Sequence, residues 1–184
     1  VGFMGSGKSV VGMALARLTG LSIVDADAEL VRRSGRPISQ IFQEDGEDAF
    51  RELERSVIRD LCAQSGKVIA AGGGSFVDPD NRKLMLTKGQ VICLTARPET
   101  ILERVSQAQG NATPNANSAE GTAPVRPLLA GDNPLVRIKE LLAQRSEAYA
   151  LALYTVETDD LTPEQVAQRV LELCRAGEIV KENT

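Results

Sequence analysis

Residues 2–9 constrain the fold more than any other stretch of the chain. They read Gly-Phe-Met-Gly-Ser-Gly-Lys-Ser and match the pattern G-x-x-x-x-G-K-[S/T]. Its glycines let backbone N–H groups turn inward around phosphate oxygens, and the helix that follows directs its positive end to the same place. A glycine-rich turn that arose by chance is the alternative. The pattern predicts a phosphate-binding loop between a strand and a helix.

The residues beside this loop contain the helix but not the strand. Apolar residues at 10, 11, 14, 15 and 18 have the spacing of an amphipathic helix, and Gly20 stands where a helix commonly ends. Only Val1 precedes Gly2, and it is not methionine. We expect the first strand to lie before Val1.

Two side chains of the loop suit a nucleoside triphosphate and its metal ion. Lys8 has the position from which a lysine reaches β- and γ-phosphates, and the Ser9 hydroxyl has the position of a Mg²⁺ ligand. The predicted nucleotide-binding segment comprises Gly5, Ser6, Gly7, Lys8, Ser9 and Val10.

Composition narrows the possibilities further. The 184 residues suffice for one α/β domain over 1–184, and a formal charge of −4 gives no indication of a nucleic-acid surface. The chain contains no histidine. Ser-His triads and histidine-ligated zinc are therefore excluded, and a proton acceptor near neutral pH would be a carboxylate.

The cysteines and the hydropathy indicate the cellular location. Cys62, Cys93 and Cys174 lie far apart, each in an apolar run. This fits reduced thiols in the core of a cytoplasmic protein better than disulfides or a metal site. No apolar stretch approaches the ~20 residues that a membrane helix needs, so we expect no membrane association.

Short β-rich runs alternate with helical patterns, which is typical of a parallel sheet with crossover helices. The predicted strands are 21–25, 67–71, 90–95 and 154–157, with one more before Gly2. We predict an α/β fold with a five-stranded parallel sheet flanked by helices, as a three-layer sandwich.

Capping residues followed by proline mark three predicted helix starts, at Asp78-Pro79, Asn133-Pro134 and Thr162-Pro163. Gln165 would complete a capping box with Thr162. A long helix is predicted over 47–65, where apolar residues recur at helical spacing before Gly66.

The segment 106–124 departs from this pattern. It is rich in Asn, Ala, Gly and Pro and has almost no large apolar side chains. Because it cannot bury enough apolar surface to stay ordered by itself, we predict a flexible insertion within a mobile lid over about 105–130.

Two carboxylates follow the predicted strand 21–25, in the sequence Val24-Asp25-Ala26-Asp27. Ligands of open α/β sheets bind beyond the carboxyl ends of the strands, which favours a functional role beside the phosphate loop. Asp27 could instead merely cap a helix that begins at Ala28.

Three glycines, Gly72 to Gly74, directly follow the predicted strand 67–71. They would leave bare backbone donors facing a ligand that approaches closely. A flexible turn is the alternative.

Two arginines occupy unusual positions for solvated charges. Arg145 takes an inward position in the apolar stripe of the helix after Pro134, so something should neutralise it. Arg51 lies three residues before Glu54, close enough for a pair on one helix. Arg145 could extend to solvent and Arg51 could form an ordinary surface pair. Together, two guanidinium groups would suit a carboxylate substrate.

The order and spacing of these motifs resemble the shikimate kinase family over nearly the whole chain. The matching stretches are GFMGSGKS, VDAD, IFQEDGEDAFRELE, AGGG, VRPLL at 125–129, and Arg145. The resemblance implies a P-loop kinase that transfers the γ-phosphoryl group of ATP to shikimate with Mg²⁺. We expect a monomer whose partner is the small-molecule substrate.

The resemblance also implies a role for each site residue. The catalytic residues would be Lys8, Asp27 and Arg126. The loop would bind the nucleotide together with Arg104, Arg126 and Pro163, of which Arg104 and Pro163 would flank adenine. The metal ion would be held by Ser9 and, through water, by Asp25. Shikimate would be bound by Asp27, Arg51, Gly73, Gly74 and Arg145. The stretch 106–124 is longer than the loop usual in the family.

Two other functions stay open. One is a kinase for another small acceptor, such as gluconate or a nucleoside monophosphate, although the chain has no Trp, two Tyr and four Phe for stacking a second base. The other is a nucleotide-binding module without catalysis, which would have no need for acceptor-site residues.

Overall fold

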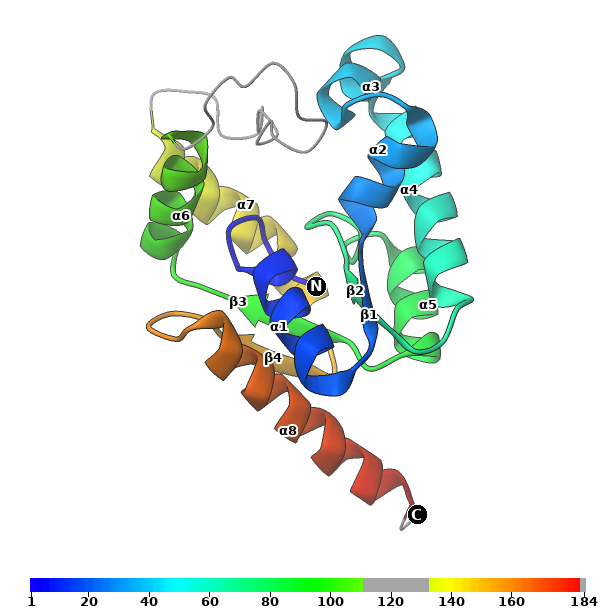
Figure 1. Cartoon of the computed structure of the whole chain (residues 1–184). Coiled ribbons are helices and arrows are strands. Elements are labelled where there is room, and N and C mark those ends of the chain that lie inside the picture. Colours follow the sequence, from blue (N-terminus) through cyan, green and yellow to red (C-terminus); the bar gives the residue numbers. More distant parts are fainter. Residues whose placement is uncertain (111–132, 183–184) are drawn as a thin grey trace.

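A computed structural model describes residues 1–110 and 133–182 and shows an α/β fold (Figure 1). The described elements are α1 (Lys8–Thr19), β1 (Ser22–Asp25), α2 (Ala26–Ser34), α3 (Ile38–Glu44), α4 (Gly46–Cys62), β2 (Lys67–Ala70), α5 (Pro79–Lys88), β3 (Ile92–Thr95), α6 (Pro98–Gly110), α7 (Pro134–Tyr149), β4 (Tyr154–Glu157) and α8 (Pro163–Glu182). Each of the four predicted β-rich runs inside the sequence contains a strand.

The strands pair in parallel, but the described residues form two separate pairs rather than one five-stranded sheet. β1 pairs with β2 and β3 pairs with β4. The start of the chain lies next to β3, where Gly2 makes an isolated parallel bridge to Leu94 and the Leu94 N–H donates to the Val1 carbonyl at 3.0 Å. A cavity of about 570 Å³ lies between the two pairs, lined by Ile69 and Ile92 among others.

Parallel pairing brings the functional motifs to one edge of the fold. Asp25 stands opposite Ala70 at the carboxyl ends of β1 and β2, and Thr95 stands opposite Glu157 at the ends of β3 and β4. Since Gly2 runs parallel to β3, the phosphate loop leaves the strands at the same edge. Ligands of open α/β folds bind at this edge.

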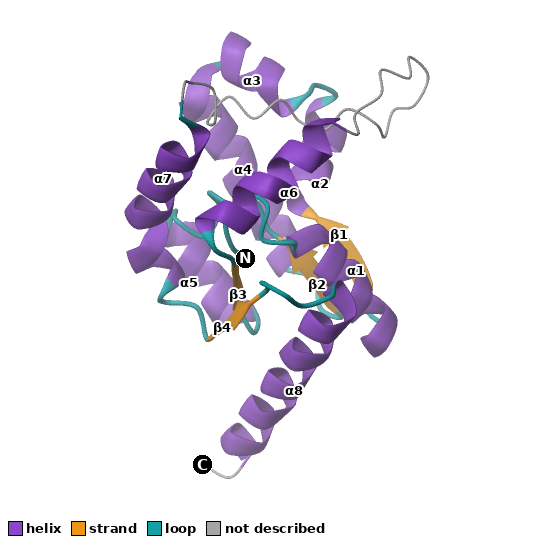
Figure 2. Cartoon of the chain, turned by 90° about the vertical axis from the view of Figure 1, so that its left-hand side faces the viewer, coloured by secondary structure: helices purple, strands orange, loops and turns teal. Residues whose placement is uncertain are grey.

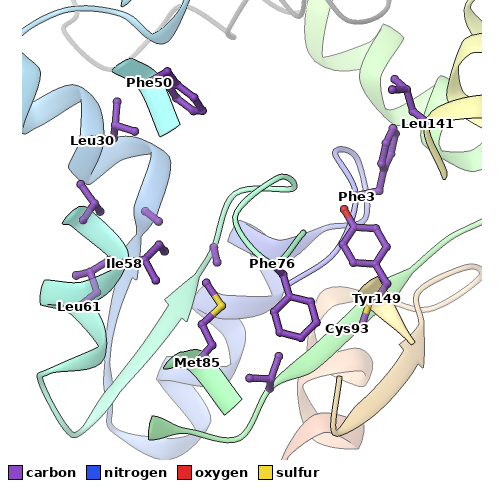
Figure 3. Close-up of a cluster of buried hydrophobic side chains, with 14 of the residues drawn as sticks. Phe3, Leu30, Phe50, Ile58, Leu61, Phe76, Met85, Cys93, Leu141 and Tyr149 are labelled. Atoms are coloured by element: carbon purple, nitrogen blue, oxygen red, sulfur yellow. The ribbon is translucent and has the colours of Figure 1, made fainter. Parts of the chain in front are cut away.

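Helices cover both faces of the β3–β4 pair, as the alternation of strand side chains requires. Cys93 belongs to one buried cluster with Phe76, Met85 and Tyr149 (Figure 3). Its neighbour Leu94 belongs to a second cluster, to which α1 and α8 contribute. Figure 2 shows α8 extending below α1, on which it packs.

The predicted helix starts are confirmed. The Asp78 carboxylate accepts hydrogen bonds from the Asp80 and Asn81 N–H groups at 3.0 Å, at the start of α5. The Asn133 side chain caps α7. Thr162 and Gln165 form the reciprocal capping box of α8. The helix predicted over 47–65 is α4, which ends at Cys62.

The predicted flexible insertion over 106–124 is wrong for its first residues. Ser106–Gly110 continue α6, because buried Val105 anchors this turn and the Gln107 side chain donates to Glu103 at 3.1 Å. Residues 111–124, most of the predicted lid and Arg126 lie outside the described residues.

The three cysteines form no disulfide. Cys62, Cys93 and Cys174 are free thiols, of which Cys93 is buried and the other two are half-buried. Burial raises the pKa of the Cys93 thiol, which keeps it protonated. Within the described residues, no helix combines the length and the apolar character that crossing a bilayer requires.

Candidate functional site

The phosphate-binding loop has the backbone geometry that its sequence predicts. Gly5 and Gly7 adopt φ values of 75° and 90°, in the region that favours glycine. Gly7 precedes α1 and offers no side-chain cap. The first N–H groups of α1 are therefore available to an anion at the positive end of the helix.

The side chains of the loop contribute unequally. The Lys8 ammonium donates to the Phe3 carbonyl at 2.9 Å, so it reaches across the loop. The Ser6 side chain is fully buried and its hydroxyl has no hydrogen-bond partner among the described residues. Only the backbone of Ser6 can therefore face a phosphate. Val10 projects outward and is 44% exposed.

Ser9 and Asp25 lie together, as the predicted metal site requires. The Ser9 hydroxyl donates to the Asp25 carboxylate at 2.7 Å. The other Asp25 oxygen accepts from the Asp27 and Ala28 N–H groups at 3.0 and 3.3 Å. Asp25 is thus the cap of α2, which begins at Ala26. The alternative in which Asp27 caps a helix from Ala28 is wrong.

This pair of hard oxygen donors fits Mg²⁺. Within residues 1–110 and 133–182, no group of three or more His, Cys, Asp or Glu side chains could enclose a metal ion. A site with one hydroxyl and one carboxylate leaves most positions to water and phosphate oxygens. Mg²⁺, which dehydrates reluctantly, is usually bound in this way.

The triglycine turn joins the phosphate loop to three charged side chains. A Cβ on Gly72 would lie 2.6 Å from an Asp27 carboxylate oxygen, and one on Gly74 would lie 2.7 Å from the Arg51 guanidinium. A Cβ on Gly73 would lie 3.5 Å from Arg145 Nη1 and also 3.3 Å from the Gly2 carbonyl. Side chains at 72 and 74 would displace Asp27 and Arg51, so the glycines allow this convergence.

Arg51 is fixed by a buried carboxylate, which confirms the predicted pair with Glu54. Its Nη1 donates to Glu54 at 2.8 Å and its Nη2 to Glu47 at 3.1 Å. Glu54 is only 5% exposed and also accepts from the Ser75 hydroxyl at 2.7 Å. Burial by itself would lower the Arg51 pKa, but the hydrogen bonds and negative charges of Glu54 and Glu47 together outweigh it and raise the Arg51 pKa.

Arg145 faces inward from α7, as predicted, but aromatic rings rather than an acid surround it. Its guanidinium carbon lies 5.3 Å from the centre of the Phe3 ring, a cation–π distance. No carboxylate of the described residues pairs with it. Tyr149, one turn further along α7, donates from its hydroxyl to the Gly73 carbonyl at 2.6 Å. Figure 3 shows Phe3 and Tyr149 in one cluster. Burial raises the pKa of the Tyr149 phenol, against the opposing Arg145 charge.

Arg104 contacts the phosphate-binding loop at Gly5. Its guanidinium donates to the Gly5 carbonyl at 3.2 Å, to the Thr158 hydroxyl at 2.9 Å and to the Thr158 carbonyl at 2.8 Å. Pro163 is half-buried at the start of α8, five residues after Thr158. Arg104 on α6 therefore contacts the connection between β4 and α8, and Pro163 stands at the end of that connection.

Three residues of the site carried no signal in sequence reasoning. Ser75, Tyr149 and Thr158 are neutral, and each acts through a partner at least 21 residues away. A glycine-rich turn followed by a serine, or a threonine at the end of a strand, is too common a pattern to single out.

Comparisons with known proteins agree with this geometry. Residues 4–175 match the family model described as shikimate kinase. The chain is 40% identical to the shikimate kinase of Thermus thermophilus, over 93% of this chain and 85% of that protein. It is 37% identical to the enzyme of Thermodesulfovibrio yellowstonii, over 93% and 90% of the two chains.

Two solved structures have the same fold. The shikimate kinase of Acinetobacter baumannii in complex with shikimate matches with a TM-score of 0.83 and 33% identity, over 96% of this chain and 90% of that one. The Aquifex aeolicus enzyme matches with a TM-score of 0.76 and 30% identity, over 97% and 96%. On these matches, the chain belongs to the shikimate kinase family.

Proposed function

We propose that this chain transfers the γ-phosphoryl group of ATP directly to a ring hydroxyl of shikimate, giving shikimate 3-phosphate and ADP. The observation that carries the proposal is the triglycine turn, which adjoins the phosphate loop at Gly2 and also contacts the three charged side chains Asp27, Arg51 and Arg145. Phosphoryl transfer depends chiefly on holding donor and acceptor in line. One turn that contacts both sites would support that alignment.

The two arginines would bind the shikimate carboxylate. Arg145 has no acidic partner among the described residues, so a bound carboxylate would supply the missing negative charge. Arg51 is held in place by Glu54 and keeps part of its fork for the ligand. A planar guanidinium binds a carboxylate through two parallel hydrogen bonds. The N–H groups of Gly73 and Gly74 would complete this pocket.

Asp27 would orient the attacking hydroxyl and accept its proton. Its carboxylate is exposed beside Gly72, at the carboxyl end of β2. With no histidine in the chain, a carboxylate is the available acceptor. Because the transition state of phosphoryl transfer is loose, the position of Asp27 should matter more than its basicity.

On the donor side, Lys8 and the N–H groups at the start of α1 would hold the β- and γ-phosphates. Lys8 would exchange its hydrogen bond to the Phe3 carbonyl for phosphate oxygens. Arg126, in the VRPLL stretch, would reach the same phosphates, and Arg104 with Pro163 would flank the adenine. The roles of these three residues rest on the family resemblance.

Ser9 and Asp25 would hold Mg²⁺, Asp25 through water. When bound, the ion neutralises charge on the phosphate oxygens. The cap hydrogen bonds that Asp25 accepts from α2 keep its carboxylate directed at Ser9 before the ion arrives.

The finer features of the fold stay predictions. A single five-stranded sheet needs a further strand between β2 and β3, where the described residues line the cavity of about 570 Å³. The single domain over 1–184, the lid, the monomeric state and the cytoplasmic location are likewise proposals.

An ADP-release assay with shikimate, gluconate and nucleoside monophosphates as acceptors tests the function. We expect ADP only with shikimate, and phosphorus NMR should show one new phosphate monoester on the ring. Turnover with another acceptor but not with shikimate would overturn the proposal. ATP binding without any acceptor-dependent ADP would indicate a module without catalysis.

A further inference from the structure

The phosphate loop contacts α6 at Gly5, and the proposed reaction assigns no role to this contact. Gly5 lies at the turn of the loop and packs directly on α6. A Cβ on Gly5 would lie 3.2 Å from the Ile101 carbonyl and 3.2 Å from a Val105 methyl. The Gly5 carbonyl accepts from Arg104, on the same helix, at 3.2 Å. The loop is thus supported from behind by α6.

Arg104 is in turn held by Thr158, the residue that follows β4. Thr158 is 2% exposed and uses each of its polar groups. Its N–H and hydroxyl both donate to the Thr95 carbonyl, at 2.9 and 3.1 Å. Its hydroxyl and carbonyl oxygens both accept from Arg104. The two ends of the guanidinium are therefore bound to a residue that is anchored to β3.

We propose that Thr158 is a positioning residue, which through Arg104 holds the phosphate-binding loop in its nucleotide-binding conformation. With the Gly5 carbonyl drawn toward Arg104, that peptide unit cannot rotate its oxygen into the phosphate cradle. A carbonyl oxygen there would repel phosphate and occupy space that N–H donors need. Preorganised donors bind more tightly because no free energy goes into ordering them.

This role differs from a contact between Arg104 and the base. An arginine that stacks on adenine affects the binding only of ligands that carry the base. An arginine that positions the loop affects the binding of every polyphosphate. Figure 1 shows α6, the β4–α8 connection and the loop on the same side of the molecule, so one arginine can bridge all three. The inference deepens the nucleotide half of the proposed function and concerns binding that needs no acceptor.

The test compares ATP with inorganic tripolyphosphate, which has no base, by isothermal titration calorimetry with Mg²⁺. Thr158→Val removes the hydroxyl at nearly constant volume. We expect the Kd of both ligands to rise by the same factor, roughly tenfold, as for one lost hydrogen bond to a charged group. Thr158→Ser keeps the hydroxyl and should bind both ligands nearly as the wild type does. Thr155→Val, on the exposed side of β4, is the matched control and should change neither Kd.

An unchanged Kd for tripolyphosphate in Thr158→Val overturns the proposal, whatever happens to ATP, and so does a Thr158→Ser variant that binds as weakly as Thr158→Val. Should Thr158→Val fail to fold, Arg104→Lys carries the same comparison, because lysine cannot bridge Gly5 and Thr158 with one fork. Hydrogen exchange of the 5–8 amides without ligand should be faster in the weak-binding variants. If Thr158→Val weakens the binding of both ligands but the wild type does not phosphorylate shikimate, the positioning role of Thr158 is supported and the proposed reaction is wrong.

Discussion

Two polar side chains of the phosphate-binding loop, Lys8 and Ser9, have hydrogen-bond partners nearby, whereas the acceptor side has a guanidinium with no acidic partner among the described residues. On the loop, Lys8 bonds to the Phe3 carbonyl and Ser9 bonds to Asp25. On the acceptor side, Arg145 lies against the Phe3 ring and no described carboxylate neutralises it. The loop is thus built mostly from contiguous backbone, and the acceptor side from side chains that distant elements bring together.

The two halves of the site should therefore be sensitive to different substitutions. A loop made of backbone donors loses little when one side chain outside it changes, unless that side chain positions the loop. A pocket made of converging charges depends on each charge and on the glycines that let them approach. The predictions below use substitutions that should affect one half and spare the other.

The largest expected effect belongs to Arg145→Ala. Removing a buried charged partner costs on the order of 2–5 kcal/mol, so kcat/KM for shikimate should fall by tens to thousands of fold. The Kd for ATP should change far less, because Arg145 contacts the loop only at the Phe3 ring among the described residues. Steady-state kinetics with shikimate varied would measure kcat/KM, and isothermal titration calorimetry would measure the Kd for ATP.

Arg145→Lys is the matched variant for this prediction. It keeps the charge but loses the planar fork, so it should recover only part of kcat/KM. Wild-type kcat/KM for shikimate in Arg145→Ala would show that the carboxylate does not bind there.

A smaller effect is expected from Gly74→Ala. Its Cβ would lie 2.7 Å from Arg51 Nη1, so the guanidinium must shift, which weakens its hydrogen bond to buried Glu54 and lowers stability to some extent. Its displacement should raise KM for shikimate by roughly tenfold, the equivalent of ~1.4 kcal/mol, without changing ATP binding. Kinetics together with thermal unfolding would separate the two effects.

Gly89→Ala serves as the control, since a Cβ there would meet its nearest described atom at 3.9 Å and the backbone is extended. Equal KM values for shikimate in the wild type and Gly74→Ala would mean that Arg51 does not touch the substrate.

The smallest effect is a stability change that spares both halves. Burial disfavours the charged form of Asp78, but hydrogen bonds from the Asn81 N–H and Arg55 outweigh it and lower the Asp78 pKa below its usual 3.8. The charged cap therefore stabilises the fold above that pH, and the stabilisation is lost as the pH falls below it. Asp78→Ala should lower the free energy of unfolding at pH 7 by ~1 kcal/mol, and by less near pH 3.

Urea unfolding at the two pH values measures this loss. Asp78→Asn retains a capping side chain and should lose less at pH 7. A loss for Asp78→Ala that is the same at both pH values would contradict the account of the cap.

How well sequence reasoning succeeded differs between the same two halves. The loop and its helix follow from one short contiguous motif, and the structure confirms them. That Asp25 joins Ser9 was expected only from the family resemblance, and the two side chains do meet at 2.7 Å. Arg51 and Arg145 could be selected from their positions on helices, but their common target could not be deduced without the turn that brings them together. Roles such as that of Thr158 depend on partners more than 50 residues away.

The pairing of the strands could be predicted only in part from the sequence. The alternation of strands and helices predicted parallel strands correctly, yet local patterns do not say how many neighbours a strand has. Among the described residues, β2 and β3 flank a cavity instead of a common neighbour along their length.

The central claim is that the acceptor side binds a carboxylate through Arg145, and the most direct test compares shikimate with its uncharged methyl ester. The ratio of kcat/KM for the two substrates is measured in the wild type and in Arg145→Ala. We predict that the wild type prefers shikimate by at least tens of fold and that the variant has almost no preference. A preference of the same size in both proteins would show that Arg145 does not bind the carboxylate.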